Sequence, residues 1–222
     1  MDKKKLKWLA AIFFLLAVLV CSCFGLFLTK SGRMLRNNLL SQFMGKGQER
    51  AQKRFQDRLE ARGQKIENLD LKIVVRKRQR ILQWFNHGIQ IATFPVALGD
   101  KPEGNKSLGN DGKTPEGDYF ICYKKENSRY HLFMAYNYPS PDDAAQACSD
   151  GRITASEAES ILDASIKQSR PIWSTPLGGP AGLHGFGTGE DWTEGTIALA
   201  NSHIEELFWN TPLKTPIQVL PE

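Results

Sequence analysis

An unbroken apolar run near the N-terminus restricts the fold of this chain more than any other feature. Residues 8–28 read WLAAIFFLLAVLVCSCFGLFL, and none of these 21 side chains is charged. A helix of about 20 apolar residues can span the hydrocarbon core of a bilayer. Within that core only helices and closed barrels satisfy every backbone hydrogen bond. We therefore expect residues 1–29 to form a cytoplasmic tip and a transmembrane anchor, separate from any globular domain.

The residues around this run predict its orientation. Four lysines within residues 3–7 precede it, which favours a cytoplasmic N-terminus. The expected location is the inner membrane, with a single pass and the C-terminal part facing the periplasm or cell envelope. A cleaved signal peptide has a shorter apolar region and a small-x-small site, and we find no good site of that kind. Lipidation at Cys23, within Val20-Cys21-Ser22-Cys23, stays open as an alternative.

Charge is distributed unevenly along the chain, although the net value is only +5. Residues 33–80 carry 14 Lys/Arg and 5 Asp/Glu, whereas residues 81–222 carry 10 and 18. Two interpretations of the basic block stay open. It is a solvated helical stalk, or it is attracted to anionic lipid head groups or an acidic polymer. Nucleic acid is not an expected partner on the far side of a membrane.

Residues 30–69 have the pattern of a basic helical stem. They are polar, with apolar residues at helical spacing. We expect Gly45-Lys46-Gly47 to divide the stem into two helices. The apolar stripe could pack on the domain, mediate dimerisation or lie on lipid, and the sequence does not choose among these. The stripe consists of Leu35, Leu39, Leu40, Phe43, Ala51, Phe55 and Leu59.

Residues 70–222 change to a pattern typical of a sheet and form the expected single domain, of α+β class and mostly β. Runs rich in β-branched and aromatic residues predict strands, and Asn86-His87-Gly88 predicts a hairpin turn between two of them. A loop rich in Gly, Asp and Asn covers residues 99–117. The predicted strands are residues 71–75, 80–85, 89–98, 119–123, 131–136 and 216–220.

Helices are expected to interrupt this sheet within residues 139–170. Ser140-Pro141 predicts one helix start, with Pro at the first helical position. Thr154 with Glu157 forms a capping-box pattern that predicts another. Ser202 with Glu205 predicts the start of the last helix in the same way.

A motif that could carry chemistry lies near the C-terminus, in GLHGFGTGEDWTEGTIALANSHIEEL, residues 182–207. His184-Gly185 is followed by a Gly-rich loop and then by Trp192-Thr193-Glu194-Gly195-Thr196. Acyl transfer needs a nucleophile, a base within hydrogen-bonding reach, and donors for the developing oxyanion. A histidine, a hydroxyl and flexible glycines in one segment are suited to these roles.

This motif resembles the signature of the YkuD-type L,D-transpeptidases, in which His-Gly precedes Ser/Thr-x-Gly-Cys. Gly99, the turn at residues 113–117 and the strand after it also match. The resemblance implies a YkuD-like β-sandwich or barrel with inserted helices. It further implies a peptidoglycan stem tetrapeptide as acyl donor, loss of its terminal D-residue, and transfer to an amine on a neighbouring stem. The sequence contains no phosphate loop, dinucleotide fingerprint or metal cluster, so we expect neither a cofactor nor a metal.

The resemblance also assigns roles to individual residues. His184 takes the place of the assisting histidine, and Gly195-Thr196 takes the place of the Gly-Cys pair, so these three are the expected catalytic residues. The expected substrate-binding residues are Gly185, Trp192, Thr193, Glu194, Lys113 and Thr114.

Thr196 is the departure that matters chemically, because it replaces the nucleophilic cysteine of the family. A thiol has a pKa near ~8.5 and is partly ionised at neutral pH, whereas an alcohol ionises nearer the ~15.7 of water. The site could be catalytically silent, could run slow Thr chemistry, or could be a changed form of a working enzyme. We expect a domain that binds or acts on stem peptides with impaired catalysis. The alternatives are a non-catalytic peptidoglycan-binding or regulatory module and an envelope interaction protein that uses its basic stem.

Two further expectations concern side chains outside the motif. A Cys122–Cys148 disulfide is permitted in an oxidising envelope, but the sequence does not establish it. We expect Trp173 to be a core residue, whereas Trp192 is either core or part of a peptide cleft.

Overall fold

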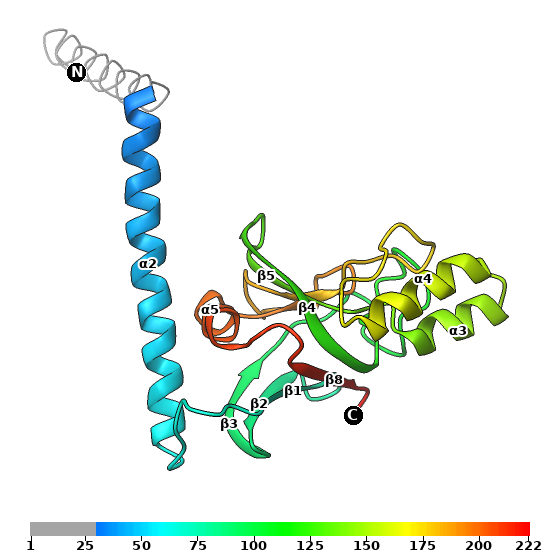
Figure 1. Cartoon of the computed structure of the whole chain (residues 1–222), viewed down its shortest axis with the longest axis horizontal. Helices are drawn as coiled ribbons and strands as arrows, with labels where there is room; N and C mark the ends of the chain where they lie inside the picture. The colour runs from blue at the N-terminus through cyan, green and yellow to red at the C-terminus, as the bar shows by residue number, and fades with distance from the viewer. Residues whose placement is uncertain (1–29) are drawn as a thin grey trace, which may run out of the picture. The chain divides into compact units, whose positions relative to one another are not determined.

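A mixed sheet of eight strands is the centre of the fold (Figure 1). The computed structural model describes residues 30–222, with side chains from residue 45 onward. The expected α+β, mostly β class is confirmed. The elements are α2 (Lys30–Glu60), β1 (Leu71–Arg76), β2 (Ile81–Asn86), β3 (Ile89–Pro95), β4 (Gly117–Ser128), β5 (His131–Tyr136), α3 (Pro141–Ser149), α4 (Ala155–Ile166), β6 (Gly182–His184), β7 (Ile197–Ala198), α5 (Asn201–Asn210) and β8 (Pro216–Leu220).

The order of the strands is β3-β2-β1-β8-β4-β5-β6-β7. The hairpin predicted at residues 86–88 joins β2 to β3, and His87 and Gly88 both have positive φ there, as a tight turn requires. The predicted strands at residues 131–136 and 216–220 are confirmed. Strand β4 is longer than predicted, because its first half pairs with β8 and its second half with β5.

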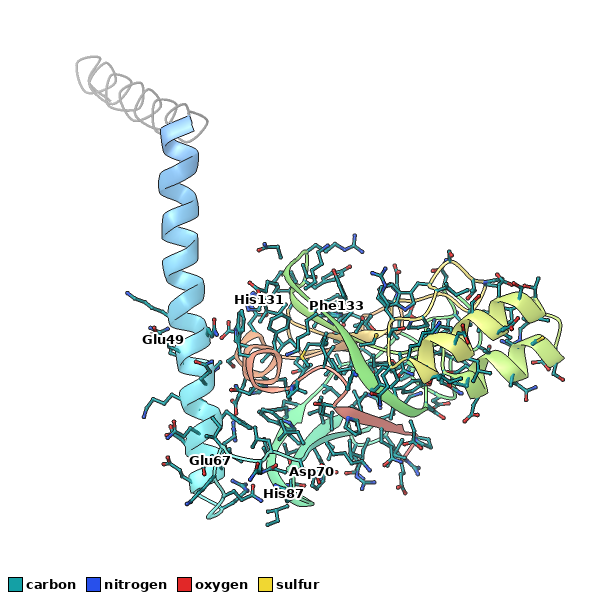
Figure 2. The ribbon with its side chains drawn as sticks, viewed as in Figure 1. Glu49, Glu67, Asp70, His87, His131 and Phe133 are labelled. Atoms are coloured by element: carbon teal, nitrogen blue, oxygen red, sulfur yellow. The ribbon has the colours of Figure 1, made fainter. Side chains whose placement is uncertain are left out.

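The inserted helices α3 and α4 lie side by side at one end of the domain (Figure 1). The helix start predicted at Ser140 and the capping box predicted at Thr154 are both formed, and Ser140 also makes a capping box with Asp143. The capping box predicted at Ser202 is wrong. Helix α5 begins at Asn201 after Ala200, which makes no side-chain cap. Glu205 instead accepts a hydrogen bond from the His131 ring at 2.9 Å, and Figure 2 shows His131 on β5.

Helix α2 runs without interruption through Gly45 and Gly47, so the predicted break there is wrong. A helical glycine costs about 1 kcal/mol, which two residues within a 31-residue helix can tolerate. Residues 50–222 form one compact unit. The final turns of α2 therefore belong with the sheet, and Ala51, Phe55 and Leu59 are buried there.

The end of α2 is held by both apolar and charged contacts. Phe55 stacks on Trp84 of β2 with ring centroids 4.7 Å apart. Arg54 and Arg58 donate to Glu206 of α5, whose carboxylate is completely buried. Because a buried carboxylate without a partner is strongly destabilising, these arginines make this part of α2 necessary for a stable domain.

Two further expectations are a membrane-spanning helix and a possible disulfide bond. No helix within residues 30–222 is apolar enough over a sufficient length to cross a membrane. The anchor expected at residues 8–28 lies outside the described residues. Cys122 and Cys148 are both free thiols, so the permitted disulfide is not formed. Burial raises the pKa of Cys122 to about 12, which makes its thiol a poor nucleophile.

Replacing Phe55 with Ala should destabilise the domain by about 3 kcal/mol, the usual cost of removing a buried aromatic side chain. Urea denaturation followed by tryptophan fluorescence measures this, since Trp84 is the stacking partner. The exposed Lys53 on the same helix provides the control, and Lys53→Ala should change stability by less than about 0.5 kcal/mol. Equal stability of the two variants would show that α2 is not part of the core.

Candidate active site

Two of the expected catalytic side chains, His184 and Thr196, come from neighbouring short strands. We call this pair the dyad. His184 is the last residue of β6, and Thr196 immediately precedes β7. These strands pair in parallel, with Leu183 opposite Ile197 and His184 opposite Ala198. This register places Nε2 of His184 2.8 Å from Oγ1 of Thr196. The sheet itself therefore brings the two side chains together.

The hydrogen bonds of His184 determine how its ring can act. Its Nδ1 lies 2.8 Å from the carbonyl oxygen of Gly185, which can only accept, so Nδ1 carries the proton. Nε2 of a neutral ring is then free to accept the Thr196 hydroxyl proton. Burial lowers the pKa of His184 below its usual value, and the Gly185 bond opposes this only in part. At neutral pH the imidazole is therefore uncharged and able to act as a base.

Aromatic rings enclose the His184 side chain. Tyr130 stacks on the imidazole at 4.8 Å, with 28° between the planes. Trp192 meets the same imidazole edge-on at 5.4 Å. Tyr130 comes from the turn between β4 and β5, and the Gly185 N–H donates to its carbonyl oxygen. These contacts keep the ring in a dry environment with one orientation.

The dyad opens into a cleft of about 750 Å³. Trp192 is 40% exposed at its mouth, so the cleft interpretation of this residue holds. Trp173 is half-buried and lines the same cleft, which corrects the expectation of a core residue. The lining also includes Lys106, Tyr123, Lys125, Arg129, Tyr130, Arg170, His184, Thr193, Glu194, Gly195 and Thr196.

Thr193 organises the loop that carries Thr196. Its hydroxyl donates to the Thr196 carbonyl oxygen at 2.6 Å and accepts the Gly195 N–H at 3.2 Å. Its backbone bonds to Leu98 and Asp100 attach the loop to the segment after β3. Thr193 is buried. Although it borders the cleft, its polar groups are used inside the protein to fix the Thr196 backbone.

Asp191, just before Trp192, anchors the start of the same loop. Asp191 accepts three hydrogen bonds from Arg80, two from Nε at 3.2 and 2.9 Å and one from Nη2 at 2.7 Å, and a fourth from the Leu98 N–H at 2.8 Å. A bidentate guanidinium–carboxylate pair defines both distance and direction. This pair therefore fixes the start of the loop, and with it the position of Trp192.

The residues that line the cleft do not include three of the expected substrate-binding residues, Lys113, Thr114 and Gly185. Thr114 is buried, and its hydroxyl accepts the Gly99 N–H at 3.0 Å. A side chain on Gly195 would meet the Lys113 carbonyl oxygen at 2.4 Å. Gly185 packs against Asn201 in the same way. In this structure these residues support the site, whereas Trp192, Thr193 and Glu194 border the cleft.

Lys77 of the β1–β2 connection holds the supporting segment in place. Its buried ammonium group donates to the carbonyl oxygens of Gly104 and Thr114 and to the Glu116 carboxylate. Burial lowers the pKa of Lys77, and Glu116 offsets part of that effect. Sequence reasoning missed this residue because Lys77 lies in a basic run that predicts a solvated surface.

The geometry can support proton transfer from a hydroxyl to a neutral imidazole, next to a cleft open to a ligand. Among the residues with described side chains, no group of three or more His, Cys, Asp or Glu could hold a metal ion. Sequence reasoning also missed Tyr130 and Arg80. Only the pairing of β5 with β6 reveals that a residue in the turn before β5 stacks on His184.

Comparison with known proteins agrees with this geometry. The sequence model of the YkuD family, described as the L,D-transpeptidase catalytic domain, matches residues 70–219. Comparison with curated protein sequences gives no match.

Solved structures resemble the chain at low identity. Bd1075 from Bdellovibrio bacteriovorus is 23% identical over 69% of this chain and 48% of that chain, with a TM-score of 0.47. A mutant of the helical cell shape determining protein Pgp2 from Campylobacter jejuni is 18% identical over 69% and 47%, with a TM-score of 0.50. L,D-transpeptidase 1 from Mycobacterium tuberculosis is 15% identical over 68% and 62%, with a TM-score of 0.37. This chain spans about half of the first two structures, and the Pgp2 likeness concerns the fold alone.

Replacing Gly195 with Ala should disturb the Thr196 loop. Its φ is +123°, and the new methyl group would meet the Lys113 carbonyl oxygen at 2.4 Å. A non-glycine residue in this region costs about 1–3 kcal/mol, which thermal unfolding measures. Gly189 is the matched control, because its added methyl group would meet nothing within 4 Å. If Gly195→Ala is no less stable than Gly189→Ala, the tight packing at Gly195 is refuted.

The His184 ring should titrate at lower pH than an unperturbed histidine, because burial disfavours its charged form. Nitrogen-15 NMR should show the Nδ1–H tautomer above pH ~6.5, with protonation beginning only below that value. As the pH falls through ~6.5, the unfolded chain takes up this proton before the folded protein does. The contribution of His184 to the free energy of unfolding therefore decreases below that pH. His184→Asn identifies the resonance, and a pKa at or above the usual value would contradict the buried neutral ring.

Proposed function

Since this chain belongs to the YkuD family of L,D-transpeptidases, we propose that its cleft binds peptidoglycan stem peptides while Thr196 leaves acyl transfer severely impaired. The observation that carries the proposal is the His184–Thr196 hydrogen bond inside an open cleft. The base, the glycine beside the nucleophile position and the space for a peptide are all present. The sulfur that the family uses for attack is not.

The chemistry of the nucleophile explains why binding and catalysis separate. A cysteine beside a histidine can be deprotonated before attack, because its pKa is close to that of the imidazole. The Thr196 hydroxyl is far less acidic and depends on His184 to remove its proton during attack. Its additional methyl group also restricts rotation about χ1. A peptide bound in the cleft would therefore stay intact for much longer than in a cysteine enzyme.

The location we propose is the cell envelope. The apolar run at residues 8–28 and the lysines before it support a single-pass inner-membrane anchor with the cleft on the periplasmic side. The basic residues within 30–69 would then lie near the membrane surface. An anchored domain that holds stem peptides without cutting them could recruit or regulate other wall components.

Replacing Thr196 with Cys should create transpeptidase or carboxypeptidase activity. Loss of a catalytic nucleophile costs up to about 10⁶-fold in turnover, so restoring the thiol should raise the rate by several orders of magnitude. Both proteins are incubated with disaccharide tetrapeptide, and the products are read by mass spectrometry. The double variant His184→Asn/Thr196→Cys controls for chemistry that does not need the base.

Two results would contradict this proposal. If the Thr196 protein converts the peptide as fast as the cysteine variant, catalysis is not impaired. If neither protein acts, more than the nucleophile has been lost. The binding half is tested separately by retention on purified sacculi. We expect the Thr196 protein to be retained, and a failure to bind would remove the peptidoglycan-binding role.

A further inference from the structure

The cleft has a charge distribution opposite to that of the domain around it. Residues 81–222 contain 10 Lys/Arg and 18 Asp/Glu, a net charge of −8. Four of those ten basic residues line the cleft, but only one of the eighteen acidic residues does, Glu194. A solvated surface of this domain would be expected to show the acidic excess. The cleft therefore concentrates positive charge where a ligand enters.

Three of the four cleft cations lack an anionic partner. Lys106 is neutralised, because its ammonium group lies 2.7 Å from Asp111. Partial burial acts to raise the pKa of Asp111, but Lys106 and three backbone N–H groups hold it at about 2. Across residues 45–222, the side chains of Lys125, Arg129 and Arg170 form neither an ion pair nor a hydrogen bond within the protein. Their charges are available to a ligand.

Arg170 is the best oriented of these three. Its guanidinium lies over the rings of both Tyr123 and Trp173, at 5.7 and 5.1 Å from the centroids. The platform is itself fixed, since the Trp173 indole N–H donates to the Tyr138 carbonyl oxygen at 3.1 Å. Stacking uses the flat face of a guanidinium and leaves the N–H groups at its edge free. Those edge donors have the spacing that a carboxylate accepts with both oxygens.

Arg129 repeats this arrangement nearer the dyad. Its guanidinium lies 4.7 Å from the centroid of Tyr130, the ring that stacks on His184. Two stacked guanidinium groups thus border one cleft, and Lys125 contributes a third charge. The arrangement suits an anionic peptide that extends from the dyad toward Arg170.

We propose that Arg170 anchors a free carboxylate of the bound peptide and makes the cleft specific for acidic ligands, with Arg129 and Lys125 adding longer-range attraction. This inference rests on the proposed function for the identity of the peptide. It does not depend on whether Thr196 can attack, because Arg170 acts on binding alone. Arg170 is thus a specificity-determining residue.

The test compares one peptide in charged and neutral forms with a second, unrelated acidic peptide. Isothermal titration calorimetry measures binding of disaccharide tetrapeptide with free carboxylates, of the same compound with its carboxylates amidated, and of triglutamate. Arg170→Gln should weaken binding of the free-acid tetrapeptide about tenfold, a modest value for a charge-assisted contact exposed to solvent. It should change binding of the amidated form by less than about twofold. Arg170→Lys keeps the charge but loses the paired donors. Its affinity for the free-acid tetrapeptide should therefore lie between those of the wild type and Arg170→Gln.

The control and the remaining outcomes separate this inference from the proposed function. Arg78 is exposed and lies outside the cleft lining, so Arg78→Gln should leave all three affinities unchanged. If neither tetrapeptide binds but triglutamate binds and Arg170→Gln weakens it, the peptidoglycan role fails and the carboxylate site stands. Equal affinity of wild type and Arg170→Gln for the free-acid ligand would overturn the inference. So would a wild-type protein that binds none of the three.

Discussion

The parallel pairing of β6 with β7 is the constraint on which the site depends. Only two residue pairs define it, yet it determines that a histidine at the end of one strand meets a hydroxyl just before the other. The segment after β3 reinforces the pairing, because Ala97 and Ala198 of β7 exchange both backbone hydrogen bonds. A shift by one residue would turn the side chains to opposite faces. The dyad is therefore a product of strand register.

Charged side chains provide the second level of support: Lys77 is buried, and Arg80 and Asp191 are partly buried. Lys77 ties the segment at residues 104–116 to β1, and the carbonyl oxygen of Lys113 then packs against Gly195. Arg80 holds Asp191 and so fixes the start of the Thr196 loop. A buried ion pair is weak evidence for net stability, but the loss of one partner leaves an uncompensated charge. We interpret these pairs as fixing the geometry of the loop that carries Thr196.

Local signals in the sequence predicted much of the fold, and their failures have physical reasons. The hairpin at residues 86–88, the helix start at Ser140 and the cap at Thr154 depend only on neighbouring residues, and they formed as predicted. The break expected at Gly45 failed because helix propensity is a weak preference within a long helix. The cap expected at Ser202 failed because Glu205 has a tertiary partner in His131.

The motif identified His184 and Thr196 because they lie within 12 positions of each other in the chain. The residues that surround them could not be found in this way. Tyr130 reaches His184 through the pairing of β5 with β6, and Trp173 borders the cleft through the connection after α4. Lys113 and Thr114 matched the family pattern but support the loop without lining the cleft. Matching a pattern indicates which residues are near a site, whereas only packing shows which face a ligand.

The central claim is that the cleft still receives a stem peptide although its nucleophile is an alcohol. The most direct measurement is an NMR titration of the Thr196 protein with disaccharide tetrapeptide, following the indole N–H signals. We predict that the signals of Trp192 and Trp173, which line the cleft, shift with peptide concentration while the peptide stays intact. The buried Trp84 should not respond. An unchanged spectrum, or peptide cleaved on the timescale of the titration, would contradict the account.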